Sequence, residues 1–109
     1  MNAWDVFDYK WPWGQHPAVI VSNRIRVELK LQVVVLSCRS LQPGERRTPK
    51  LNEAVLDIED GLNWPTLCRC DLLWTVEKSL LKNHRGSVSA ERRRDIARKV
   101  IQGLAFADL

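Results

Sequence analysis

Long apolar segments are absent from this sequence. The longest unbroken apolar runs, Ala18 to Val21 and Val33 to Leu36, fall far short of the roughly 18 residues that a membrane-spanning helix needs. The N-terminus contains the acidic Asp5 and no apolar stretch of signal-peptide length, so we expect a cytoplasmic protein. Low-complexity tracts are also missing, and 109 residues suit one hydrophobic core. We therefore predict a single soluble domain over residues 1–109.

Cysteine is scarce, and its spacing fits no disulfide framework. The three cysteines, Cys38, Cys68 and Cys70, are an odd number, which is typical of reduced thiols in a cytosolic protein. Cys68 and Cys70 would face the same side of a strand, where a zinc ion could bind them together with Cys38 or His16. Their spacing is not that of a zinc knuckle, so we expect small core residues, no metal and no cofactor.

Basic residues outnumber acidic ones. The chain has 17 Lys and Arg against 13 Asp and Glu, a net charge of +4 and a pI near 9.3. This balance favours an anionic partner, either a nucleic acid or an acidic protein segment. The same charge can equally serve solubility alone, so the distribution of the basic residues has to distinguish between an anionic partner and solubility.

The sequence predicts a mainly β fold with one helix at its end. Apolar, β-branched and aromatic runs predict strands at residues 4–11, 18–22, 31–37, 53–57 and 66–76, and a brief one at 86–88. Residues 23–30 alternate charged and apolar side chains, which fits an edge strand or a connecting loop. Ser89 as N-cap and an apolar stripe at helical spacing predict a helix from Ala90 to about Gly103. The stripe consists of Ile96, Ala97, Val100, Ile101 and Leu104. We expect an antiparallel sheet curled into a small barrel, with this helix packed on it.

Four segments resemble, in order, the PemK/MazF toxin family. Residues 16–22 are similar to the family's Arg-Pro-Ala-Val strand, residues 35–40 to its next buried strand, and residues 53–56 to its Glu-Val-Val-Leu strand. Residues 60–89 look like its late strand, its Lys-bearing turn and the step into the last helix. This resemblance covers nearly the whole chain. It implies an SH3-like small barrel of the CcdB/PemK/MazF kind, a homodimer, and an endoribonuclease that an antitoxin neutralises.

The sequence departs from the family's pattern at two positions. His16 stands where the family has Arg before Pro-Ala, and Arg39 stands where it has Thr after the following core strand. RNA cleavage without a metal needs proton transfer at the 2′- and 5′-oxygens and a cation for the charged phosphorane. Because histidine exchanges protons near neutral pH, we predict His16 as acid/base, Arg39 as phosphate clamp and Ser40 as a hydrogen-bond donor to the phosphate. The alternative is structural, with His16 capping a strand, Arg39 paired to an acid and Ser40 satisfying backbone.

Other side chains are candidates for RNA binding. Two flank the first turn and could stack bases, and three belong to the basic loop at residues 40–50. These residues are Trp11, Trp13, Arg46, Arg47 and Lys50. Two alternatives are equally compatible with the sequence. The tryptophans could pack in the core or at a dimer interface, and the basic residues of the loop could be solvated surface charge. We expect Trp64 and Trp74 in the core.

The leading hypothesis is therefore a toxin of a type II toxin-antitoxin system that cuts single-stranded RNA, such as mRNA, without a metal ion. Its partners would be a second copy of the chain and a cognate antitoxin with an acidic segment. A catalytically inactive member that binds RNA or protein is the main alternative. A gyrase poison of the same fold is disfavoured, because those proteins resemble one another in a Trp-Gly-Ile ending and this chain ends in Ala105–Leu109.

Overall fold

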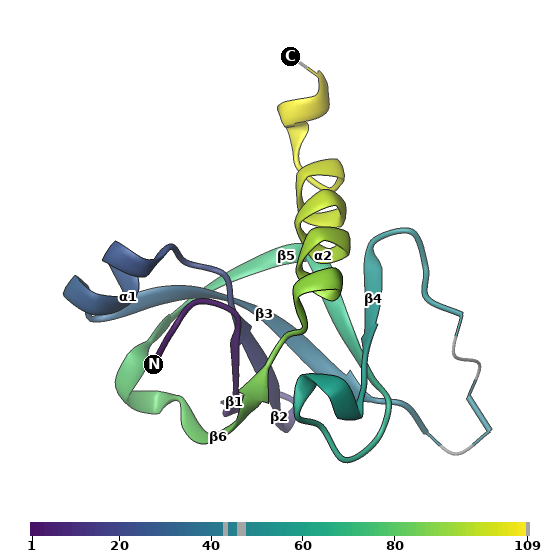
Figure 1. Cartoon of the computed structure of the whole chain (residues 1–109), viewed down its shortest axis with the longest axis horizontal. Helices are drawn as coiled ribbons and strands as arrows, with labels where there is room; N and C mark the ends of the chain where they lie inside the picture. The colour runs from purple at the N-terminus through teal and green to yellow at the C-terminus, as the bar shows by residue number, and fades with distance from the viewer. Residues whose placement is uncertain (43, 46–47, 109) are drawn as a thin grey trace.

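A six-stranded antiparallel sheet is the frame of the molecule (Figure 1). The computed structural model describes residues 1–42, 44, 45 and 48–108. The strands are β1 (Asp5–Trp11), β2 (Gly14–Ile20), β3 (Gln32–Ser40), β4 (Glu53–Leu56), β5 (Thr66–Glu77) and β6 (Lys82–Ser87). The helices are α1 (Arg24–Leu29) and α2 (Ala90–Gln102), and the 3₁₀ turns are η1 (Ile58–Asp60), η2 (Lys78–Leu80) and η3 (Ala105–Asp108). The sheet, in the order β4-β5-β3-β2-β1-β6, curls into a half-barrel, which confirms the expected mainly β fold with a C-terminal helix.

The first hairpin is tighter than the sequence predicted. Trp11 pairs with Gly14 across a two-residue turn, and Gly14 has a φ of 130°, which a side chain would disfavour. β2 therefore begins at Gly14, ahead of the expected start after Pro17. Proline is tolerated there because the pairing of β2 with β3 begins only at Ala18.

The segment at residues 23–30 contains the helix α1 (Arg24–Leu29), so neither of the two alternatives considered for it, an edge strand or a connecting loop, is correct. The Asn23 side chain accepts a hydrogen bond from the Arg26 backbone N–H at 2.9 Å, which caps the first turn of α1. Val27 is buried against the sheet, and the Lys78 ammonium donates to the Val27 carbonyl at 2.6 Å. The alternation of charged and apolar residues in the sequence gave no sign of this short, capped helix.

The C-terminal helix follows the prediction closely. α2 covers Ala90–Gln102. Ile96, on the inner face of this helix, is fully buried, and Val100 packs against the same core. Ile101, expected in the buried stripe, is 55% exposed, because it lies away from the sheet. No helix in the described part of the chain is long and apolar enough to cross a membrane.

The central strands bury side chains on both faces of the sheet. On β2, Val19 belongs to the core beneath α2 and Ile20 to the core on the opposite face. On β3, Leu36 and Val35 divide in the same way. This two-sided burial explains why these strands read as continuous apolar runs in the sequence.

Candidate active site

A small cavity at one end of the sheet collects polar side chains from β1, β2, β3 and β6. Its volume is about 150 Å³, and its lining includes Asp8, His16, Ser40, Trp64 and Arg85. His16 and Ser40, both predicted as catalytic, thus line the same cavity. The structure brings these two predicted residues together from different strands.

Arg85 is the cation of this cavity. Its Nη1 donates to Asp8 Oδ1 at 3.0 Å, and the other oxygen of Asp8 accepts from Asn83 Nδ2 at 3.2 Å. The Asp8 residue is only 9% exposed, so this pair holds the guanidinium in a fixed place. Arg85 was not predicted as a site residue, and its position before Gly86 in the family-like segment was the one signal for it in the sequence.

Ser40 bonds to Trp64, which was expected in the core. The Trp64 indole N–H donates to Ser40 Oγ at 2.7 Å, while 52% of Trp64 is exposed. The prediction of a buried Trp64 is therefore wrong. β5 begins only at Thr66, which pairs with Ser40 at the end of the β3–β5 ladder. Trp64 therefore precedes the strand and lies at the edge of the sheet.

Arg39 does not share the cavity of His16. Neighbouring residues on a strand point to opposite faces, and Arg39 lines a separate pocket of about 210 Å³ that includes Trp13, Arg69 and Trp74. Its guanidinium donates to both carboxylate oxygens of Glu45, at 3.1 and 2.7 Å. This pairing is the main cause that lowers the pKa of Glu45 to about 2. The geometry therefore corrects the expected joint site of His16 and Arg39, and Arg85 takes the place of the cation.

The two tryptophans of the first turn lie on the Arg39 side. Trp11 is 2% exposed and donates its indole N–H to the His16 carbonyl at 3.2 Å, so the expected stacking of a base on Trp11 conflicts with its burial. Trp13 is 52% exposed and stacks in parallel on Trp11 at a centroid distance of 5.3 Å. Trp74 meets both rings edge to face and is partly buried, as expected for a core residue.

The basic loop contributes little that the structure describes. Lys50 is exposed, and its backbone N–H donates to a Glu53 carboxylate oxygen at 3.0 Å. Arg46 and Arg47 lie outside the described residues. The RNA contacts expected of these three residues stay predictions.

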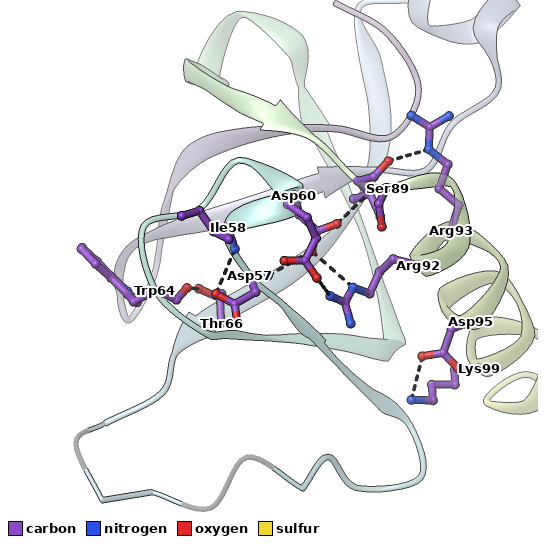
Figure 2. Close-up of polar contacts among 12 residues, drawn as sticks. Asp57, Ile58, Asp60, Trp64, Thr66, Ser89, Arg92, Arg93, Asp95 and Lys99 are labelled. Atoms are coloured by element: carbon purple, nitrogen blue, oxygen red, sulfur yellow. Dashed lines mark hydrogen bonds and ion pairs between the residues drawn. The ribbon is translucent and has the colours of Figure 1, made fainter.

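A buried aspartate anchors the loop that carries Trp64 (Figure 2). Asp60 has no exposed surface and accepts from the backbone N–H groups of Asp57 and Ser89, each at 2.9 Å, and from Arg92 Nε at 3.3 Å. It thereby joins η1 to the first turn of α2. The carboxylate also satisfies backbone donors that would otherwise be unpaired at the start of both elements.

Two glycines bring the same loop against β6. A Cβ atom at Gly61 would lie 2.5 Å from the Arg85 carbonyl oxygen, and one at Gly86 would lie 2.7 Å from the Gly61 Cα. Only glycine permits so close an approach of two backbones. The contact fixes the segment that carries Trp64 beside the strand that carries Arg85.

The cysteines take no part in this cavity. All three thiols are free and buried, as expected for small core residues, and they belong to the core beneath α2. A hydrogen bond with the Cys38 thiol, followed by burial, raises the pKa of Cys68, and a hydrogen bond with the Cys68 thiol, followed by burial, raises the pKa of Cys70, which keeps both thiols protonated at neutral pH.

A known protein family and several solved structures match this chain. Residues 11–104 match the family described as PemK-like, MazF-like toxin of type II toxin-antitoxin system. The chain belongs to this family. The match confirms the resemblance seen in the sequence and includes His16, Ser40 and Arg85. No curated protein matches the sequence of this MazF-like toxin.

Solved structures share the fold of this MazF-like toxin at low sequence identity. An endoribonuclease in complex with its cognate antitoxin from a mycobacterial species superposes with a TM-score of 0.81 at 19% identity, covering 96% of this chain and 95% of that one. Mycobacterium tuberculosis toxin MazF-mt6 gives 0.76 at 17% identity, covering 91% and 94%. MazE-MazF from Deinococcus radiodurans gives 0.72 at 12% identity, covering 94% and 92%. At these identities the likeness establishes the fold.

Proposed function

We propose that this MazF-like toxin is an endoribonuclease that cuts single-stranded RNA without a metal ion, in the cavity lined by His16, Ser40 and Arg85. The observation that carries the proposal is that a proton-exchanging group, a hydroxyl and a fixed cation line one cavity. Its volume of about 150 Å³ is well below the roughly 300 to 1,000 Å³ of sites for whole small molecules. A single phosphodiester group suits this size better than a complete nucleotide.

The proposed reaction is attack of an RNA 2′-oxygen on the adjacent phosphorus. The 2′-hydroxyl gives up its proton, the bond from phosphorus to the 5′-oxygen breaks, and the leaving oxygen gains a proton. The products are a 2′,3′-cyclic phosphate and a 5′-hydroxyl. We assign proton transfer to His16, because the other carboxyl or imidazole group that lines this cavity within the described residues, Asp8, is occupied by Arg85 and Asn83.

The two remaining polar side chains act on the phosphate. The five N–H donors of an arginine side chain match phosphate oxygens, and the bond to Asp8 uses Nη1 of Arg85. Arg85 is therefore positioned to stabilise the doubly charged phosphorane. Ser40 accepts a hydrogen bond from Trp64, so its own hydroxyl proton remains free to donate to a phosphate oxygen.

Cleavage of a long single-stranded RNA in EDTA, with mapping of the fragment ends, tests the proposal. We expect 2′,3′-cyclic phosphate ends, and a loss of roughly 100-fold or more in rate for His16→Ala, with RNA affinity nearly unchanged. Arg85→Ala should weaken both rate and salt-dependent binding. Arg69→Ala is the matched control, since Arg69 lines the other pocket and pairs with Asp71.

RNA left intact by the wild-type protein would refute the nuclease. Binding without cleavage would instead favour the inactive member of the family. A greater effect of Arg39→Ala than of Arg85→Ala would restore the role first predicted for Arg39.

We also propose that the protein pairs with a cognate antitoxin bearing an acidic segment, and with a second copy of itself. The net charge of +4 supports the first partner, and structural neighbours include a toxin solved with its antitoxin. The second would cover exposed apolar side chains on a small domain. Light scattering and titration with an acidic antitoxin peptide test both. A cytoplasmic location and a single domain stay predictions.

A further inference from the structure

Trp64 is set apart from the other tryptophans. Trp11, Trp13 and Trp74 form one aromatic cluster, and Trp4 packs against the core beneath α2. Within the described residues Trp64 has no aromatic neighbour, and it is 52% exposed. Its ring thus offers a free aromatic surface beside the candidate active site.

Hydrogen bonds nevertheless hold Trp64 in place. The indole N–H of Trp64 donates to Ser40 Oγ at 2.7 Å, and the backbone carbonyl of Trp64 accepts from Thr66 Oγ1 at 3.1 Å. The carbonyl of the next residue, Pro65, accepts from the Leu41 N–H at 3.1 Å. These contacts tie the loop to the ends of β3 and β5. A ligand that stacks on this ring would lose little additional conformational entropy from the protein.

Trp64 and Ser40 stand between two cavities of different size. Both line the cavity of about 150 Å³ that contains His16 and Arg85. Both also line a second cavity of about 470 Å³, together with Leu41, Glu45 and Pro65. The larger volume falls within the range of sites that take a small planar molecule.

No cationic side chain of the described residues lines the second cavity to bind a phosphate. Its carboxylate, Glu45, already accepts from the Arg39 guanidinium through both oxygens, at 3.1 and 2.7 Å. The aromatic ring and the two apolar side chains instead suit the flat face of a nucleobase.

We propose that the second cavity is a nucleobase subsite, in which an unpaired base adjacent to the scissile phosphate stacks on Trp64. The proposal rests on the proposed function in that it takes the smaller cavity as the phosphate site. Trp64 would then help to determine which sequences are cut, while His16 and Arg85 act on the phosphate.

The test measures affinity for short single-stranded RNA that cannot be cut because the attacking 2′-hydroxyl is missing. One RNA carries the mapped cleavage sequence, or a mixed sequence if no cleavage is found, and another lacks the bases next to the scissile position. Stacking of one base is worth roughly a five- to 150-fold preference for the intact RNA. Trp64→Leu should reduce this preference to about twofold, and Trp64→Phe should keep most of it.

Phe106→Leu is the matched control, because Phe106 in η3 is also an exposed aromatic residue, at 65%, and lines neither cavity. It should keep the full preference for the intact RNA. The proposal is overturned if Trp64→Leu keeps the preference, if Phe106→Leu loses as much, or if neither RNA binds. Light scattering that shows dissociation of a wild-type oligomer in Trp64→Leu would also overturn it, by making Trp64 an interface residue. RNA that binds with the expected preference but is never cut supports the subsite and refutes the nuclease.

Discussion

The buried carboxylate of Asp60 should stabilise the fold far more than the exposed carboxylate of its neighbour Glu59 does. Asp60→Ala removes an acceptor with no exposed surface, which leaves the backbone donors of Asp57 and Ser89 without a partner and Arg92 without its buried counter-ion. An unsatisfied buried donor costs about 1–3 kcal/mol, and breaking a buried ion pair costs about 3–5 kcal/mol. These costs overlap, because all involve one carboxylate and water can reach part of the Arg92 side chain, which is 25% exposed. We therefore expect the free energy of unfolding to fall by about 3–5 kcal/mol.

Glu59→Ala is the internal control for this prediction. Glu59 pairs with the same guanidinium, since Arg92 Nη2 donates to its carboxylate at 2.7 Å, but the Glu59 side chain is 53% exposed. An exposed ion pair contributes less than about 1 kcal/mol. Urea denaturation followed by circular dichroism should therefore show a large fall in midpoint for Asp60→Ala and a small one for Glu59→Ala, with similar slopes. Losses that agree within about 0.5 kcal/mol would refute the reasoning.

Three further predictions concern a close contact, an ion pair and the thiols. Gly61→Ala should cost about 1–3 kcal/mol more than Gly44→Ala in urea denaturation, because both have positive φ but only the Cβ at Gly61 would clash with backbone; equal losses would exclude the contact. Arg39→Ala should raise the pKa of Glu45 from about 2 toward its ordinary value of 4.5. Any stability from this lowered pKa is present above pH 4.5 and lost as the pH falls toward 2, and NMR titration of Glu45 measures the shift. The buried thiols should resist a thiol reagent at pH 7 in the folded protein and react in urea, and rapid reaction without denaturant would contradict their burial.

Periodicity and capping signals predicted the fold well where local rules decide the structure. The runs from Val33 to Leu36 and from Ala18 to Val21 became central strands buried on both faces, and the stripe through Ile96 became the inner face of α2. The helix α1 was missed, because a six-residue helix with one buried side chain, Val27, has almost no hydrophobic periodicity. Its stability depends on the Asn23 cap, on the packing of Val27 in the core with side chains of the sheet, and on the hydrogen bond from Lys78 in η2.

The candidate site was only partly predictable, because its geometry depends on strand faces and on distant pairing. His16 and Ser40 were found from the sequence and do line one cavity. Arg39 was placed with them because it stands at the family's Thr position and its charge could clamp a phosphate, yet the register of β3 turns Ser40 toward the cavity and Arg39 away from it. A one-residue difference along a strand is enough to reverse the face, and no composition signal reports it.

The cation of the site comes from the far edge of the sheet. β6 and β3 are separated by β1 and β2 in the strand order, so Arg85 reaches the cavity of Ser40 only because the sheet curls. The Gly61–Gly86 contact joins the loop beside Ser40 to β6, and Asp60 ties that same loop to the start of α2. The polar cavity therefore depends on residues that never touch it. If the proposed RNA cleavage takes place in this cavity, a substitution at Gly61 or Gly86 should move Trp64 and Arg85 relative to one another and reduce the cleavage rate more than a surface change with the same loss of stability.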